Sequence, residues 1–178
     1  MPKRSLNLAK AYTLLEPGPV VLITTAHKDR SNIMTLSWHC MMEFEPPLVG
    51  FVMSAGNDSF ELLKASRECV INIPTVDIAK QVVSVGNSHG SKVDKFAAFG
   101  LTAKPAAQVK APLIGECYAN LECKVVDTRL VNQYNFFILE VVKGWIDTSV
   151  KKPRTLHHRG NGVFMVAGEV LKLPSRMK

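Results

Sequence analysis

The chain has 178 residues and a formal net charge of +7, with 47% hydrophobic and 21% charged residues. This length suits one domain with a core of ordinary size, and the composition is typical of a globular protein rather than a disordered one. The apolar stretches are shorter than the roughly 20 residues of a membrane helix, and the basic start MPKRSLNLAK lacks the apolar core of a secretory signal. We therefore expect a cytoplasmic protein with no membrane contact.

The first elements are predicted to be strands joined by turns. Residues 20–26 are rich in β-branched side chains and predict a strand. A polar turn at 28–32 leads to a second strand, 33–42, so the two form a hairpin. Pro46-Pro47 forces an extended break, after which the apolar residues 48–54 predict a third, largely buried strand.

Short helices are predicted to follow. A helix starts at 56–58 and runs to about Ser66, with Asp58 and Glu61 spaced as a capping box. Residues 68–73 predict another strand, stopped by a proline. A second short helix then follows, capped by Asp77 and ended by a glycine.

The rest of the predicted body is mainly β. Residues 86–91 are a loop by composition, and 92–99 predict one or two helical turns closed by a glycine. After a connector at 103–112, residues 117–127 alternate between apolar and polar and predict a strand with one face in the core. Residues 136–146 predict a long apolar strand.

The order of these elements indicates the fold class. Too few helices separate the strands for a doubly wound parallel sheet, so an antiparallel barrel with short helical insertions is favoured. We expect one domain over 1–178, with a core at about 15–146 and a C-terminal extension at 147–178. Residues 151–178 have mixed polarity and are expected to pack on a neighbour.

The cysteines do not form a recognisable metal or redox motif. Their spacing contains no C-x-x-C pair, which argues against a zinc ribbon or a thioredoxin-type site. We expect reduced thiols, mostly buried. They are Cys40, Cys69, Cys117 and Cys123.

The positive charge is partly concentrated at the two ends of the chain. One interpretation is that the ends are simply solvated. The other is that they compensate an anionic cofactor or dock an acidic electron-transfer partner.

Small polar side chains crowd the segment from Asn32 to Leu63, around the predicted start of a helix. Free backbone N–H groups and the helix dipole at such a start suit a phosphate dianion. Between them, apolar and aromatic side chains offer walls for a flat ring, a composition expected around flavin mononucleotide (FMN). The polar residues are Asn32, Thr35, Ser37, Ser54, Asn57 and Ser59, and the wall residues are Met34, Trp38 and Phe60.

In their order and spacing, several stretches resemble the flavin reductase-like, FMN-binding split-barrel family, in particular its flavoredoxin-type members. These stretches are GPVVLITT (18–25), NIMTLSW (32–38), FEPPLVGFVMS (44–54), NDSFELL (57–63), VINIP (70–74), SHGSKVDKF (88–96) and LECKVV (121–126). The resemblance implies a mainly β fold with short helices, a six-stranded antiparallel Greek-key split barrel. It also implies a homodimer with FMN near the dimer interface.

The resemblance implies specific contacts to the flavin. The phosphate is expected at Ser54, Asn57 and Ser59, and a second anchor is formed by Ser88, Gly90, Ser91 and Lys92. The isoalloxazine ring is expected beside Asn32, Met34, Thr35, Ser37, Trp38, His39 and Cys40. On one straight strand these ring contacts would alternate between two faces, so the strand must bend or end there for both sets to reach the ring.

Reduction of a flavin places negative charge on its N1–C2 edge, where a nearby donor or cation is stabilising. His39, Cys40 and His157 are the catalytic candidates. His157 and His158 are alternatively plain polar surface. Arg154 and Arg159 flank them, in a glycine-containing loop that could close over a flavin.

The leading prediction is an FMN-dependent oxidoreductase, either a flavin reductase or a flavoredoxin-like electron carrier. The resemblance implies NADH or NADPH as a transient donor, and the absence of a GxGxxG fingerprint after a strand is compatible with this. A small electron-transfer protein is the alternative donor. A non-catalytic flavin- or haem-binding module is an alternative. A basic nucleic-acid-binding barrel is disfavoured, because aromatic residues make up only 7% of the chain.

Overall fold

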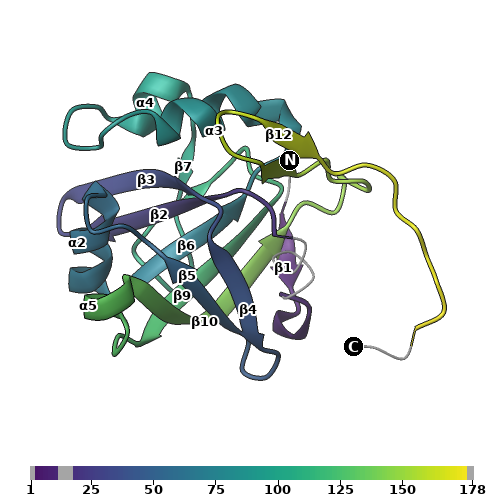
Figure 1. Ribbon diagram of the computed structural model, residues 1–178, viewed down its shortest axis with the longest axis horizontal. Coiled ribbons are helices and arrows are strands. Elements are labelled where there is room, and N and C mark those ends of the chain that lie inside the picture. Colours follow the sequence, from purple (N-terminus) through teal and green to yellow (C-terminus); the bar gives the residue numbers. More distant parts are fainter. Residues whose placement is uncertain (1–2, 12–17, 176–178) are drawn as a thin grey trace.

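The computed structural model describes residues 3–11 and 18–175 (Figure 1). Its body is an eight-stranded sheet, in which all the strand pairs are antiparallel. The strands are β1 (Arg4–Leu6), β2 (Val21–His27), β3 (Arg30–Leu36), β4 (His39–Glu43), β5 (Leu48–Val52), β6 (Glu68–Ile73), β9 (Ala119–Asp127) and β10 (Phe136–Ile146).

The strand order shows a barrel that is split along one side. Along the sheet the order is β3-β2-β6-β9-β10-β5-β4, with β1 added on β10. The end strands β3 and β4 are joined by Ser37 and Trp38 alone, so the sheet must curl until its two ends come close together. The predicted mainly β, Greek-key split barrel is therefore confirmed.

Short helices and hairpins cover this barrel. The helices are η1 (Leu8–Lys10), α2 (Asp58–Ser66), η2 (Val76–Ile78), α3 (Ala79–Gly86), α4 (Lys95–Phe99) and α5 (Val131–Tyr134). Two small sheets pair β7 (Ala103–Lys104) with β8 (Leu113–Ile114) and β11 (Leu156–His158) with β12 (Phe164–Val166). In Figure 1, α3 and α4 lie above β3, and the β11–β12 hairpin lies beside α3.

Strands β2 and β3 are buried on both faces, because the barrel interior lies on one side and α3 on the other. Ile23 and Met34 belong to the barrel core, whereas Leu22 and Ile33 pack with residues of α3. This explains the unbroken apolar run of β2, which an alternating half-exposed strand would not show.

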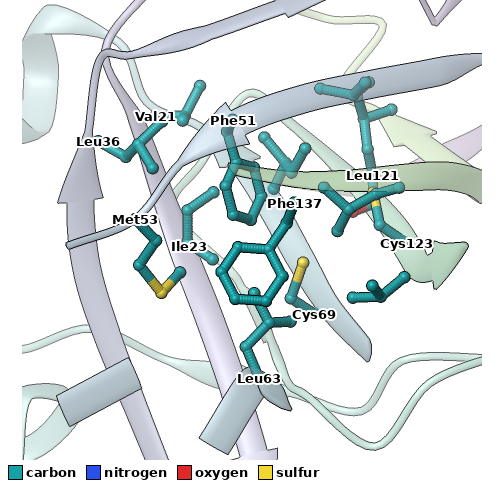
Figure 2. Close-up of a cluster of buried hydrophobic side chains, with 14 of the residues drawn as sticks. Val21, Ile23, Leu36, Phe51, Met53, Leu63, Cys69, Leu121, Cys123 and Phe137 are labelled. Atoms are coloured by element: carbon teal, nitrogen blue, oxygen red, sulfur yellow. The ribbon is translucent and has the colours of Figure 1, made fainter. Parts of the chain in front are cut away.

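Aromatic rings fill the centre of the barrel (Figure 2). The ring of Phe137 on β10 lies 6.0 Å from that of Phe51 on β5 and 5.5 Å from that of Phe60 on α2. Phe51 and Phe137 are fully buried, and their contact packs β5 against β10. The contact of Phe60 with Phe137 packs helix α2 against the same strands.

Two predicted boundaries near β3 were wrong. The hairpin turn is confined to Lys28 and Asp29, because pairing of β2 with β3 already begins at His27 and Arg30. The single strand predicted at 33–42 divides at Ser37 and Trp38. This division, together with the addition of β1, gives eight strands in place of six.

Two predicted caps were also wrong. The residue before α2 is Asn57, whose side chain makes no capping bond, while the Asp58 carboxylate accepts a hydrogen bond from Ser91 N at 3.2 Å. Asp77 accepts a bond from Thr75 Oγ1 at 3.0 Å and does not cap α3. Each carboxylate was predicted to cap a helix, but Asp58 accepts from a backbone N–H far along the chain and Asp77 from a hydroxyl two residues away.

The third predicted helix begins later than expected, at Lys95, because Asp94 is its cap. The Asp94 carboxylate accepts from Phe96 N and Ala97 N, at 3.0 and 3.3 Å. Gly100 closes the helix with a positive φ of 63°.

The cysteines are all free thiols: Cys69, Cys117 and Cys123 are buried, and Cys40 is exposed. Burial raises the pKa of the Cys117 and Cys123 thiols. Within residues 3–11 and 18–175, no helix has the length and apolar character needed to cross a membrane.

Candidate functional site

The loop of residues 87–94, which connects α3 to α4, packs against β3. Asn32 on β3 donates from Nδ2 to Ser59 Oγ at 3.0 Å, and both residues are buried. Gly90 lies so close to Asn32 that a Cβ there would overlap its amide. Asn32 Oδ1 is buried and has no hydrogen-bond partner among the described residues. The loop thus approaches β3 by its bare backbone.

The same loop is fastened to the start of α2. Besides accepting from Ser91 N, the Asp58 carboxylate lies 3.9 Å from the His89 imidazole. Close by in sequence, Ser54 is exposed and Asn57 has a half-exposed side chain without a capping bond. Loop 87–94 therefore faces a helix start where Asn57 makes no side-chain cap and the exposed Ser54 hydroxyl accepts a hydrogen bond from Gly56 N at 3.3 Å.

The buried Lys95 lies at the base of this loop. Its Nζ donates to Ile33 O at 2.8 Å and to Val85 O at 3.0 Å. Burial lowers the pKa of Lys95, while the charge of Asp58 opposes that shift. No salt bridge joins Lys95 to the adjacent Asp94 among the described residues, because Asp94 caps α4 and the Lys95 ammonium donates to carbonyls.

A cavity of about 330 Å³ lies between the end of β3, α3 and the β11–β12 hairpin. Thr35 lines it from β3 and Ser37 from just after β3, and the Thr35 hydroxyl donates to Val82 O at 2.7 Å. From the hairpin side it is lined by His158 and Phe164, whose rings lie 5.1 Å apart. We call this the hairpin cavity.

A separate surface groove of about 510 Å³ follows β4. His39 and Cys40 line this groove, which we call the β4 groove. The His39 ring makes a hydrogen bond with Pro19 O through Nε2 at 2.7 Å, and Nδ1 is buried without a partner among the described residues. Burial lowers the pKa of His39, so the ring is neutral near pH 7. Trp38, just before β4, is 73% exposed.

The structure thus distributes the predicted site residues over five environments. Ser54, Asn57, Ser88, Gly90, Ser91 and Lys92 lie at the start of α2 or in loop 87–94. Thr35 and Ser37 line the hairpin cavity, whereas Trp38, His39 and Cys40 belong to the chain break and the β4 groove. Met34 and Phe60 pack in the barrel core, and Asn32 and Ser59 are buried against each other.

His157 is separate from these groups: its Nε2 lies 3.0 Å from Thr155 Oγ1, and it does not line the hairpin cavity. The neighbouring His158 does. The sequence analysis also missed the roles of Asp58 and Lys95 in holding loop 87–94. No local pattern reveals them, since their partners lie 33 and 62 residues away.

A sequence model of the flavin reductase-like domain matches residues 14–164. The chain belongs to this family. The match extends past residue 146, through β11 to the first residue of β12, and the predicted family resemblance is confirmed.

The chain is also similar in sequence to individual proteins. The chain is 33% identical to the protein YddH of Escherichia coli strain K12 over 178 residues, covering 92% of this chain and 94% of YddH. It is 27% identical over 144 residues to HsaB of Mycobacterium tuberculosis, the reductase subunit of a flavin-dependent monooxygenase, covering 80% and 73% of the two chains.

Solved structures of the flavin reductase-like family share the fold. An FMN-binding domain of a flavin reductases-like enzyme from Shewanella baltica OS155 superposes with a TM-score of 0.92 at 29% identity, covering 97% of this chain and 98% of the other. Flavoredoxin of Desulfovibrio vulgaris (Miyazaki F) superposes with a TM-score of 0.79 at 24% identity, covering 88% and 90%.

Proposed function

We propose that this chain binds FMN where loop 87–94, the start of α2 and β3 meet, and that it is an FMN-dependent oxidoreductase. The observation that carries the proposal is the convergence of these elements: Gly90 lies on Asn32, and Ser91 is bonded to Asp58. A backbone brought so close to β3, beside an uncapped helix start, is suited to a phosphate ester.

The residues present fit the phosphate end of FMN. The nine-residue helix α2 presents its positive end, and the Asn57 side chain at that end makes no capping bond. Ser54 and Lys92 are exposed, so a hydroxyl and an ammonium are available for charge-assisted hydrogen bonds. Asp58 already uses Ser91 N, which leaves these side chains as the principal donors.

For the flavin ring we propose the region where β3 ends and β4 begins. Thr35 on β3 and Ser37 just after it would contribute hydroxyls. Trp38 from the link between the strands, and His39 and Cys40 from β4, would contribute the other contacts. Bound FMN would supply the hydride and electron chemistry. His39, held neutral and oriented by Pro19 O, would act by hydrogen bonding rather than as a cation.

Two versions of this function are chemically adjacent. A flavin reductase takes electrons from NADH or NADPH, whereas a flavoredoxin-like carrier takes them from a small electron-transfer protein. We also propose a homodimer, supported by the exposed apolar side chains Trp38 and Met42 beside the β4 groove.

The decisive experiment is the absorption spectrum of the purified protein, followed by fluorescence titration of the apoprotein with FMN. A flavin spectrum or micromolar binding is expected. Anaerobic addition of NADH and NADPH then separates the two versions, because only the reductase bleaches the flavin. A colourless protein that does not quench FMN fluorescence would contradict the proposal.

The position of the phosphate is tested by Ser54→Asp. A carboxylate at this exposed position would repel the dianion, so we expect FMN affinity to fall by about tenfold, equivalent to about 1.4 kcal/mol. Ser5→Asp on β1 introduces the same charge at another exposed position and is expected to leave the affinity unchanged. Equal affinities for both variants would remove Ser54 from the site.

A further inference from the structure

A lysine side chain is rarely buried, yet Lys95 is only 5% exposed. Among the ion pairs of the described residues, none involves Lys95. Instead, its ammonium donates to two backbone carbonyls, those of Ile33 and Val85. Removing an ammonium from water is costly unless its hydrogens are bonded. The bonds to these two carbonyls therefore offset the cost of burying Lys95.

Both carbonyls lie where regular secondary structure leaves backbone groups without a hydrogen-bond partner, one at a helix end and one on a strand at the sheet edge. Val85 lies in the last turn of α3, where carbonyls lack partners within the helix, and a cation is favoured there by the helix dipole. Ser88 Oγ also donates to Val85 O, at 3.2 Å. Ile33 lies on β3, which ends the sheet and has one edge without a strand partner.

Lys95 therefore connects the three elements that surround loop 87–94. It is the first residue of α4, and its side chain reaches the end of α3 and the middle of β3. The other contacts of the loop are longer or more exposed. Ser91 N lies 3.2 Å from Asp58 and Ser88 Oγ lies 3.2 Å from Val85 O, both at the long end of the normal range, and the exposed His89 ring lies 3.9 Å from Asp58.

We propose that Lys95 is a positioning residue, which fixes the position of loop 87–94 against β3 and thereby sets the geometry of the phosphate site. The role in FMN binding rests on the proposed function; the role in holding the loop does not. Lys95 itself would touch no part of the cofactor, because it is buried and two of its three ammonium hydrogens are bonded to backbone carbonyls.

The test compares Lys95→Met with Lys80→Met. Methionine keeps an unbranched side chain, shorter than that of lysine by one atom, and removes its donors. Lys80 is an exposed lysine on α3 that serves as the control. For each variant, FMN affinity is measured by fluorescence, and amide hydrogen exchange of residues 87–94 is measured without FMN. Urea unfolding first establishes that the variants are folded under these conditions.

For Lys95→Met we expect FMN affinity to fall by about tenfold and amide exchange at Ser91 to rise by about tenfold, because the loop opens without global unfolding. Lys80→Met should match the wild type in both. Wild-type exchange rates in Lys95→Met would overturn the proposal, and so would faster exchange with unchanged FMN affinity.

If the wild-type protein does not bind FMN, the proposed function fails, while the exchange rates still test the anchoring of the loop. If Lys95→Met does not fold, Lys95→Gln replaces it, since its shorter amide retains donors for one carbonyl. We expect smaller changes in the same direction, and wild-type affinity and exchange in Lys95→Gln would overturn the proposal.

Discussion

The His39 side chain connects β4 to the segment before β2, near the split in the barrel. Its Nε2 bonds to Pro19 O just before β2, while its neighbours Trp38 and Cys40 face outward. Because the ring is largely buried and makes no ion pair within the described residues, its uncharged form is favoured. Protonation of this ring therefore lowers the stability of the folded protein.

The consequence is a pH dependence with a definite sign. The folded pKa of His39 lies below the unperturbed value of 6.5, so the unfolded chain binds the proton more readily. Stability is complete above pH 6.5 and declines as the pH falls below it. We expect urea unfolding of the wild type to show lower stability at pH 5 than at pH 7.5, with a smaller decline in His39→Gln.

The control for this measurement is His158→Gln, which removes an exposed imidazole on β11. It should keep the wild-type decline between pH 7.5 and pH 5. An equal decline in His39→Gln and the wild type would show that His39 does not contribute to it.

At the scale of elements, the barrel is held by contacts between strands that are distant in sequence. Strand β10 pairs with β9, β5 and β1, and its Phe137 packs against β5 and α2. Helix α2 thus rests on the same ring that joins the strands. The start of α2, where we propose the phosphate, is therefore positioned by the core.

Phe137→Ala should lower the free energy of unfolding by about 3–5 kcal/mol, because it leaves a cavity beside Phe51 and Phe60. Val126→Ala on β9 removes a side chain that is 48% exposed and should change stability by less than about 0.5 kcal/mol. Denaturant unfolding monitored by circular dichroism measures both. A loss in Phe137→Ala no larger than that in Val126→Ala would contradict this account of the core.

At the scale of the whole molecule, the chain ends in an extended segment. After β12, residues 167–175 lead away from the barrel (Figure 1). They carry large apolar side chains that are mostly exposed: Val170 is 75%, Leu171 79% and Leu173 69% exposed. In a homodimer, this segment would have a partner surface on which to bury them.

We therefore expect the double variant Leu171→Asp/Leu173→Asp to weaken the proposed homodimer by at least about tenfold in dissociation constant. Lys172→Asp makes the same change in net charge without removing an apolar side chain, so it should have a smaller effect. Analytical ultracentrifugation over a range of concentrations measures both. A dimer equally stable in both variants would exclude this segment from the interface.

Local sequence patterns predicted most of the strands. The bounds of β6 and β10 agree with the prediction at both ends, because each is an apolar segment enclosed by turn residues or a proline. Alternation in β9 correctly placed Ala119 and Leu121 in the core. Helix α4 is bounded by local signals, since Asp94 caps its start and Gly100 its end. The predicted start was nevertheless three residues early.

The sequence by itself also determined the family, because motifs spread over most of the chain occur in the expected order. It could not determine which groups meet. Asp58 was predicted to cap its own helix, but its carboxylate bonds to Ser91 N. The Lys95 ammonium bonds to Ile33 O and Val85 O, which no local pattern indicated. Likewise, whether β3 continues into β4 depends on the sheet ends curling together. Periodicity reports the local backbone, whereas these contacts join segments far apart in the chain, and so only the tertiary structure decided them.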